Sequence, residues 1–309
     1  MRILIELPTW LGDCIMATPA IENIVNFDND IEIIFIGSFV SIEAMKNHPK
    51  AVKTVVLDKK YSSLYKTARN LGDFDVFFSF RSSTRSKFLK FFISAKNKYQ
   101  FDKNKYINCH QVEKYNNFIN TSLNINTNPG KLRIYKKNQS SGVIQKSILG
   151  INPGASYGSA KRWYPEEFAK VASELSGKFD IVIFGGPGEK DIAADIENGL
   201  IDNGVTNYQN LATNTTIPEL INHISKLAFF ITGDSGPMHV AAAFQVPTVA
   251  IFGPTKDDET SQWMNEKSII VKKNLDCQPC MKRTCPLQHH NCMRLITSGS
   301  VMKAVSKLY

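Results

Sequence analysis

Short apolar runs alternate with amphipathic segments along most of the chain. Residues 2–7, 31–37, 52–58 and 74–80 are brief runs rich in aliphatic and aromatic side chains, which predict buried strands. Residues 14–27, after the first run, carry apolar side chains at helical spacing. Strands that alternate with helices are typical of βαβ units, so we predict an α/β fold with a mainly parallel sheet.

The pattern is interrupted at residues 124–141 and then begins again. The interruption is polar and contains a Pro-Gly pair, although residues 132–135 could still form a short strand. Strand, glycine turn and helix then recur within residues 147–175, 179–196 and 228–244. We therefore predict two doubly wound, Rossmann-like α/β domains.

The first predicted domain covers residues 1–141 and the second covers residues 142–309. A chain of 309 residues suits this division. Ligands of doubly wound sheets bind outside the carboxyl ends of the strands. The cleft between two such domains is therefore the expected active site.

Net charge adds a class of partner to this picture. The chain carries +9, so nucleic acid, anionic lipid and phosphorylated substrates are plausible partners. Residues 81–114 hold nine Lys and Arg against two acidic residues. A run of this kind is most often a solvated surface, and the alternative is a landing patch for an anionic acceptor or a membrane face.

The sequence shows no segment that predicts membrane insertion or export. No run of 18 apolar residues is present, and the apolar run near the start is too short for a signal peptide. We expect a cytoplasmic protein in which the six cysteines stay reduced.

The stretch "TGDSGPMHVAAAFQVPTVAIFGPT", residues 232–255, resembles a serine protease motif in its first letters. It lies between an apolar strand and an alanine-rich helix and matches neither Gly-Asp-Ser-Gly-Gly-Pro nor Gly-x-Ser-x-Gly. A glycine turn that enters a helix instead predicts a diphosphate site at Ser235 and Gly236, with His239 one helical turn on. The alternative is that Asp234 and Ser235 only cap the helix.

Two further glycine-containing loops follow predicted strands. In residues 152–163, Ser156 and Tyr157 offer hydroxyl groups and Lys161 offers a cation for a diphosphate. In the second loop, Glu189 could accept hydrogen bonds from ribose hydroxyls, or it could be an acid favoured by the helix dipole. Neither loop has the spacing of a P-loop, which disfavours ATP hydrolysis of that kind.

Asp13 lies where the first strand passes into its helix. A carboxylate at this point could remove a proton from an attacking hydroxyl group. Capping of the helix by Asp13 is the equally plausible alternative.

Cysteines cluster near the C-terminal end of the sequence. Cys277, Cys280, Cys285 and Cys292 have the spacing C-x2-C-x4-C-x6-C, with two histidines between them. The cluster permits a tetrahedral zinc site, but it does not match the usual paired spacings, and a metal-free loop is the alternative. A zinc-dependent nucleic-acid-binding protein would fit the charge, but basic and aromatic residues are not interleaved as in known modules.

Four stretches together resemble the bacterial lipopolysaccharide heptosyltransferases of glycosyltransferase family 9. They are residues 8–21, 152–169, 232–255 and 277–293, and they follow the family's order across nearly the whole chain. The third is diagnostic of the wider family. The first and fourth resemble the members that add the second heptose.

The resemblance implies a GT-B fold, in which two Rossmann-like domains face each other across a cleft and the last helix can pack back on the first domain. It implies inverting, cofactor-free and metal-independent transfer from ADP-L-glycero-β-D-manno-heptose to the first heptose of heptosyl-Kdo2-lipid A. Transfer as in the first heptosyltransferase, or by another sugar transferase of the family, is the alternative. The implied partners are the nucleotide sugar, the anionic lipopolysaccharide acceptor and the cytoplasmic face of the inner membrane, with no nucleic acid.

The resemblance also implies roles for single residues. Asp13 resembles the catalytic base, and Lys161 resembles the lysine that contacts the donor diphosphate and assists the reaction. The expected donor contacts are Ser156, Tyr157, Lys161, Glu189, Asp234, Ser235, Gly236 and His239. Arg81, Arg85 and Lys87 lie in the acceptor domain, where a strongly anionic acceptor would meet them.

Overall fold

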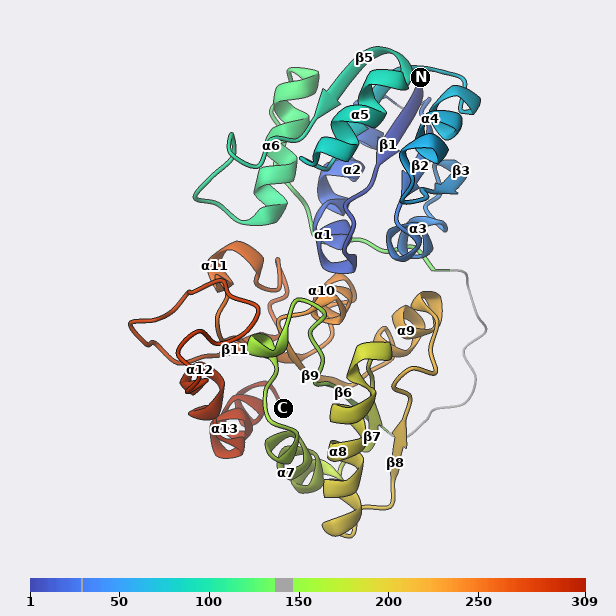
Figure 1. The fold of residues 1–309 in the computed structure, drawn as a ribbon. Coiled ribbons are helices and arrows are strands. Elements are labelled where there is room, and N and C mark those ends of the chain that lie inside the picture. Colours follow the sequence, from blue (N-terminus) through green and yellow to red (C-terminus); the bar gives the residue numbers. More distant parts are fainter. Residues whose placement is uncertain (29, 137–146) are drawn as a thin grey trace. The chain divides into compact units, whose positions relative to one another are not determined.

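A computed structural model describes residues 1–28, 30–136 and 147–309. The chain forms two compact units, Met1–Asn138 (unit 1) and Gln139–Tyr309 (unit 2). The domain boundary predicted between residues 141 and 142 lies outside the described residues. Figure 1 shows the helices and strands of both units.

Unit 1 is built on a five-stranded sheet in which every neighbouring pair is parallel. The order across the sheet is β3-β2-β1-β4-β5. The strands are β1 (Arg2–Glu6), β2 (Glu32–Gly37), β3 (Ala51–Val56), β4 (Asp73–Ser79) and β5 (Ser94–Gln100). The first four match the predicted apolar runs, whereas β5 is polar and was not predicted. Residues 132–135, the optional strand, adopt no regular structure.

The helices of unit 1 cover both faces of this sheet. From β1 to β3 the chain moves across the sheet toward one edge, and from β4 to β5 it moves toward the other edge. Because the crossovers between parallel strands are right-handed, the helices that connect the two sets of strands lie on opposite faces of the sheet. The helices are α1 (Leu11–Met16), α2 (Thr18–Phe27), α3 (Phe39–Met45), α4 (Tyr61–Asn70), α5 (Thr84–Phe92) and α6 (Gln111–Leu123). The single helix predicted over residues 14–27 is thus two helices, with Pro19 in the first turn of α2.

Unit 2 repeats the plan with six parallel strands in the order β11-β10-β9-β6-β7-β8. The strands are β6 (Ile148–Asn152), β7 (Asp180–Ile183), β8 (Tyr208–Asn210), β9 (Phe229–Gly233), β10 (Thr248–Ile251) and β11 (Ser268–Val271). The longer helices are α7 (Pro165–Leu175), α8 (Lys190–Asp202), α9 (Ile217–Ile224), α10 (Gly236–Ala243) and α13 (Ser298–Leu308). Short helical turns are η1 (Ser159–Lys161), η2 (Pro187–Glu189), α11 (Asp257–Thr260) and α12 (Asn291–Arg294).

The last helix, α13, packs within unit 2. It contacts α7 and β11, and its Val301 and Val305 are buried in the same core as Leu149 and Phe229. Packing of this helix on the first domain stays a prediction.

Each sheet has one point where the chain reverses its direction of travel. In unit 1 this point lies between β1 and β4, and in unit 2 it lies between β6 and β9. Doubly wound folds bind their ligands at this point, outside the carboxyl ends of the strands. None of the helices within the described ranges is both long and apolar enough to span a membrane.

Candidate active site

The turn between β9 and α10 holds a buried ion pair. Asp234, which is 5% exposed, lies directly after β9. Its Oδ2 lies 2.5 Å from Nζ of Lys161 and accepts a 2.6 Å hydrogen bond from Oγ1 of Thr255. Lys161 Nζ also donates to the backbone oxygen of Asp234 at 3.2 Å. The carboxylate thus fixes the ammonium group beside the start of α10.

Ser235 is the residue at the N-cap of α10, but its hydroxyl group does not cap the helix. It lies 3.2 Å from Nδ2 of Asn152 and 3.2 Å from Oγ1 of Thr232. The alternative in which Asp234 and Ser235 only cap the helix is therefore wrong. Asn152 ends β6 and Thr232 belongs to β9, so this contact lies at the reversal point of the sheet.

The first turn of α10 has the properties of an anion site. Gly236 opens the helix, and the leading N–H groups of any helix lack partners within it and carry partial positive charge. His239 lies on the same helix and is 3% exposed. The structure therefore brings together Lys161, Asp234, Ser235 and Gly236 at one strand-to-helix turn, as the sequence predicts.

The loop that carries Lys161 is held by the cysteine-containing segment. Tyr157 donates a 2.7 Å hydrogen bond from its hydroxyl group to the backbone oxygen of Met281. Its ring centroid lies 5.0 Å from Lys161 Nζ and 5.5 Å from Arg283 Cζ, so two cations face the same ring. Ser156 is exposed next to it. The Tyr157 hydroxyl group thus positions the loop, and contact of this group with a donor stays a prediction.

Glu189 stabilises its own loop. It ends η2, is 8% exposed, and its Oε2 accepts a hydrogen bond from the backbone N–H of Gly186. Its side chain fills the space next to Gly154, where an added Cβ would lie 2.3 Å from Cγ of Glu189. These contacts give the carboxylate a structural role, and contact with a ribose stays a prediction.

The four clustered cysteines line one small cavity together with His289 and His290. Burial, and then the charges of the other three thiols, raise the pKa of Cys292 to about 11. Within the described ranges, no three His, Cys, Asp or Glu side chains are arranged to hold a metal ion. The segment has a structural role in holding the loop of Lys161, and the choice between a zinc site and a metal-free loop stays a prediction.

In unit 1, Asp13 is the third residue of α1, and the N-cap residue is Trp10. The alternative in which Asp13 caps the helix is therefore wrong. Asp13 is half-buried, and its charge adds to the effect of burial in raising the pKa of Tyr115. The neighbouring Cys14 is fully buried, which raises its pKa to about 12 and keeps the thiol neutral. Asp13 is the carboxylate of this turn, and its role as a base stays a prediction.

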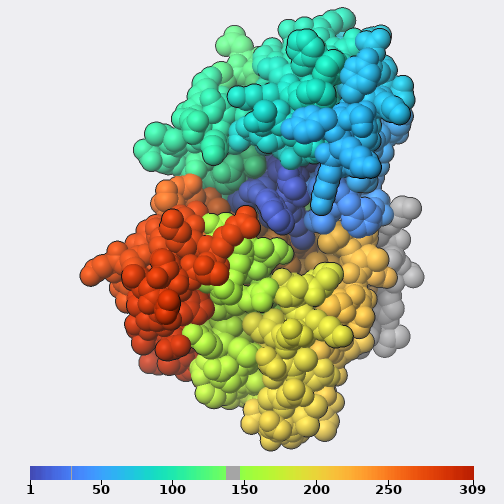
Figure 2. Space-filling model, in the orientation of Figure 1, coloured from blue at the N-terminus to red at the C-terminus, as the bar shows by residue number. Residues whose placement is uncertain are grey.

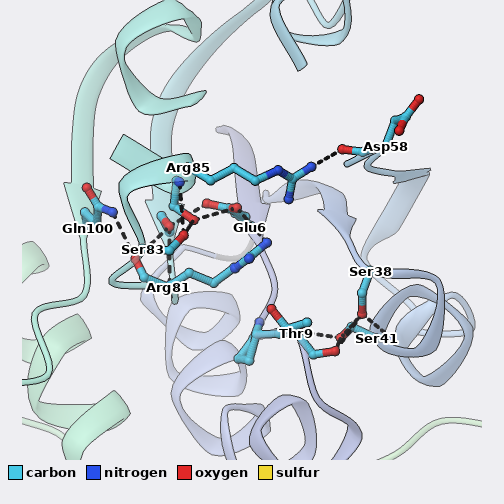
Figure 3. A network of polar contacts seen from close by, with 12 residues as sticks. Glu6, Thr9, Ser38, Ser41, Asp58, Arg81, Ser83, Arg85 and Gln100 are labelled. Carbon is cyan, nitrogen blue, oxygen red and sulfur yellow. Dashed lines mark hydrogen bonds and ion pairs between the residues drawn. The ribbon is translucent and has the colours of Figure 1, made fainter. Parts of the chain in front are cut away.

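The loop before α1 is fixed by serine hydroxyl groups. Ser38 Oγ donates a 2.7 Å hydrogen bond to the backbone oxygen of Thr9, and Ser41 Oγ donates to the backbone oxygen of Pro8 (Figure 3). These contacts position the turn that leads into Asp13.

A buried carboxylate and two arginines lie at the reversal point of the unit 1 sheet. Glu6 is 1% exposed and accepts hydrogen bonds of 2.6 Å from Ser79 Oγ and 2.9 Å from Ser86 Oγ. Its Oε1 lies 3.3 Å from Nη1 of Arg81, and Arg85 extends past it to the backbone oxygen of Asp58 (Figure 3). Burial raises the pKa of Glu6, and these hydrogen bonds and charges oppose the shift.

The two arginines leave this cluster with more positive than negative charge. Burial lowers the pKa of Arg85, and the nearby charge of Arg81 lowers it further. Lys87 lies on α5 as an exposed side chain. The sequence predicted Arg81, Arg85 and Lys87 as site residues but missed Glu6, which orders Arg81. Glu6 lies at the end of an apolar strand 75 residues before Arg81, so no local pattern links the two residues.

Known proteins share this sequence and architecture. The family model of glycosyltransferase family 9 (heptosyltransferase) matches residues 73–291. The chain belongs to glycosyltransferase family 9. It is therefore a glycosyltransferase enzyme, and the family resemblance seen in its four motifs is confirmed.

Two curated relatives cover the entire chain, and a third covers part of it. Lipooligosaccharide heptosyltransferase 2 of Campylobacter jejuni serotype O:2 is 43% identical over 315 residues, which cover 100% of this chain and 98% of the relative. The protein of the same description from serotype O:6 is 41% identical, with 100% and 99% coverage. Lipopolysaccharide heptosyltransferase 2 of Escherichia coli K12 is 29% identical over 175 residues, which cover 56% of this chain and 50% of the relative.

Solved structures share the fold. A family 9 glycosyltransferase from Veillonella parvula superposes with a TM-score of 0.83 at 23% identity, covering 99% of this chain and 96% of the other. ADP-heptose LPS heptosyltransferase II of Escherichia coli superposes with a TM-score of 0.82 at 20% identity, covering 100% and 98%. The GT-B fold class is thereby confirmed for this family 9 glycosyltransferase.

Proposed function

We propose that this glycosyltransferase moves L-glycero-D-manno-heptose from ADP-heptose to the heptose already present on the lipopolysaccharide inner core. This is the activity of ADP-heptose:lipopolysaccharide heptosyltransferase II. The observation that carries the proposal is the full-length similarity to two proteins described as lipooligosaccharide heptosyltransferase 2, at 43% and 41% identity.

The donor is proposed to bind in unit 2, with its diphosphate at the start of α10. The N–H groups of this helix start and the ammonium group of Lys161 offer complementary charge. A carboxylate would repel a diphosphate, so we assign Asp234 to holding Lys161 rather than to touching the donor. Ser235 and Gly236 are the proposed direct contacts at this turn.

The proposed reaction is a single displacement with Asp13 as base. An acceptor hydroxyl oxygen attacks the anomeric carbon of the heptose while the bond from that carbon to the diphosphate oxygen breaks. The hydroxyl proton passes to the Asp13 carboxylate, and the electron pair of the broken bond leaves with ADP. Fixed charges such as Lys161 stabilise the charge that grows on the leaving group. No step of this reaction calls for a metal or another cofactor.

The acceptor is proposed to bind in unit 1 near Arg81 and Arg85. Inner-core lipopolysaccharide carries phosphate and carboxylate groups, which bind guanidinium groups through paired hydrogen bonds. Glu6 holds Arg81 without neutralising both arginines. Lys87 is a further exposed cation on α5, the helix that carries Arg85. Because the acceptor is lipid-anchored, we propose that the enzyme works in the cytoplasm in peripheral contact with the inner membrane.

A transfer assay tests this function and separates it from its alternative. Purified protein is incubated with ADP-heptose and with Kdo2-lipid A acceptors that carry zero or one heptose, and the products are weighed by mass spectrometry. We expect one heptose to be added to the acceptor that already carries one. Transfer only to the heptose-free acceptor would assign the protein to the first step instead.

A further inference from the structure

Five aromatic side chains form a continuous row on the outer side of α4 and α5. Tyr61 and Phe88 have ring centroids 4.9 Å apart, as do Tyr65 and Phe92. Phe92 also contacts Phe88 at 4.8 Å and Phe91 at 5.0 Å. The two helices lie side by side on unit 1 (Figure 1). We call these five residues the aromatic row.

Three rings of the aromatic row, those of Tyr61, Tyr65 and Phe91, are exposed, whereas Phe88 and Phe92 are partly buried and pack against the core. The helices are also anchored through other residues, since Leu64 and Leu89 are buried in the cluster between them and the sheet. Phe91 is 77% exposed, Tyr61 is 50% exposed and Tyr65 is 44% exposed. The segment that carries them forms part of the surface in the space-filling view (Figure 2). A contiguous exposed apolar patch of this kind usually marks an interaction surface.

Positive charge is concentrated on the same stretch of the chain. Residues 59–98 hold ten Lys and Arg against Asp73 and Asp75, a net charge of +8 within a chain whose total is +9. Neither α4 nor α5 contains an acidic residue. The cations of this stretch are Lys59, Lys60, Lys66, Arg69, Arg81, Arg85, Lys87, Lys90, Lys96 and Lys98. Five of these cations, Lys66, Arg69, Arg85, Lys87 and Lys90, lie on α4 and α5 themselves.

A bilayer with anionic headgroups matches this combination of side chains. Aromatic rings favour the boundary between headgroups and acyl chains, and Lys and Arg side chains are attracted to anionic lipids. Single-stranded nucleic acid is the other polyanion that binds aromatic and basic surfaces, and it does so by stacking bases on ring faces. In the aromatic row four of the ring pairs meet edge to face, with interplanar angles between 60° and 90°. Because the edge of one ring covers the face of its neighbour, these faces are not open for bases to stack on. This arrangement favours a lipid bilayer over single-stranded nucleic acid as the partner.

We propose that the outer side of α4 and α5 docks on an anionic lipid bilayer, with Phe91 inserted below the headgroups and the surrounding lysines on the lipid phosphates. The inference rests on the proposed function, because a lipid-anchored acceptor is what brings the enzyme to a bilayer. It adds which surface of the enzyme faces the membrane.

Flotation with vesicles tests the docking surface without acceptor or donor. The probe is the full-length protein with vesicles of phosphatidylglycerol and phosphatidylethanolamine, compared with vesicles of phosphatidylcholine alone. The test variant is F91A/K66E, which changes one ring of the aromatic row and one exposed lysine of α4. Its matched control is I201A/K303E, which changes an exposed apolar residue of α8 and an exposed lysine of α13 in unit 2.

We expect the wild type to float with the anionic vesicles, to lose this binding at high salt, and to leave the phosphatidylcholine vesicles unbound. The F91A/K66E variant should lose at least about tenfold in lipid partitioning, and the control should lose nothing. Equal binding by F91A/K66E and wild type would overturn the proposal, as would absence of wild-type binding. Binding to single-stranded DNA that anionic vesicles do not compete away would also overturn it.

Transfer to an acceptor stripped of its acyl chains separates this proposal from the proposed function. F91A/K66E should keep wild-type turnover with this soluble acceptor, because neither residue belongs to the proposed donor or acceptor sites. Failure of the wild type in this assay contradicts the function, whereas failure in flotation contradicts only the docking surface.

Discussion

Asp234 shows how the role of a single residue depends on its contacts. Its sequence context suggests a donor contact, whereas its carboxylate engages Lys161 at 2.5 Å and Thr255 at 2.6 Å. Breaking a buried ion pair of this kind costs about 3–5 kcal/mol, because one charge is left buried and alone. The sequence predicts Lys161 and Asp234 as members of one site. It could not predict their pairing, since 73 residues separate them.

The proposed base is tested by Asp13→Asn, which keeps the size of the side chain and removes its capacity to accept the proton. We expect turnover to fall by about 100-fold or more, since general base catalysis contributes at least that much in typical cases. Calorimetric titration with ADP should give an unchanged dissociation constant, because donor binding is assigned to unit 2. Wild-type turnover in this variant would remove Asp13 from the reaction.

Glu6 predicts a pH dependence of stability with a definite sign. Burial raises its pKa in the folded protein above the ordinary value of 4.5. The folded state therefore takes up a proton at a higher pH than the unfolded state, and the stability gained by protonation is lost as pH rises through the folded pKa.

Glu6→Gln removes this titration. When the pH is lowered from 7 to 5, the free energy of unfolding of the wild type should rise relative to that of Glu6→Gln. Urea denaturation at each pH measures this difference. A difference between the two proteins that does not change with pH, or that changes in the opposite direction, would show that Glu6 is not held with a raised pKa.

At the scale of elements, the loop with Lys161 and the cysteine-containing segment form one structure. Ala160 donates a backbone hydrogen bond of 3.0 Å to Arg283, and His290 Nε2 lies 2.9 Å from the backbone oxygen of Ala160. Gly158 permits this contact, because a Cβ there would lie 2.3 Å from the backbone oxygen of Arg283. The segment thus sets the position of η1 and of Lys161.

Gly158→Ala should separate these two segments. We expect ADP to bind about tenfold more weakly, since small displacements of binding groups cost this much or more, together with a lower melting temperature. Gly188→Ala is the matched control, because a Cβ at Gly188 meets no atom within 4 Å. If both variants bind ADP as the wild type does, the loop is not held in the way described.

The strands of unit 1 could be predicted where their sequence is apolar, including the partly exposed edge strand β3, and the polar strand β5 was missed. β1, β2 and β4 are apolar because both faces are covered, whereas β5 is polar and partly exposed at the sheet edge. The extent of α1 could not be predicted, since the N-cap residue is Trp10, whose side chain makes no capping hydrogen bond. Local patterns predict apolar elements better than polar edge strands and helix termini.

At the scale of the whole chain, two sheets of the same plan carry different chemistry at corresponding points. The reversal point of unit 1 holds Glu6 with Arg81, and that of unit 2 holds Asn152 with Ser235. The alternation of strands and helices predicted both doubly wound sheets. The side chains that order each site come from separate strands or from the loops that follow those strands. Their meeting depends on the order of the strands in the sheet, which the pattern of apolar residues does not predict.

The most direct test of the account is a crystal structure of the protein with ADP bound. We predict that the diphosphate lies within hydrogen-bonding distance of the backbone N–H groups at the start of α10 and of Nζ of Lys161. ADP bound away from residues 234–236, with Lys161 still paired only with Asp234, would contradict it.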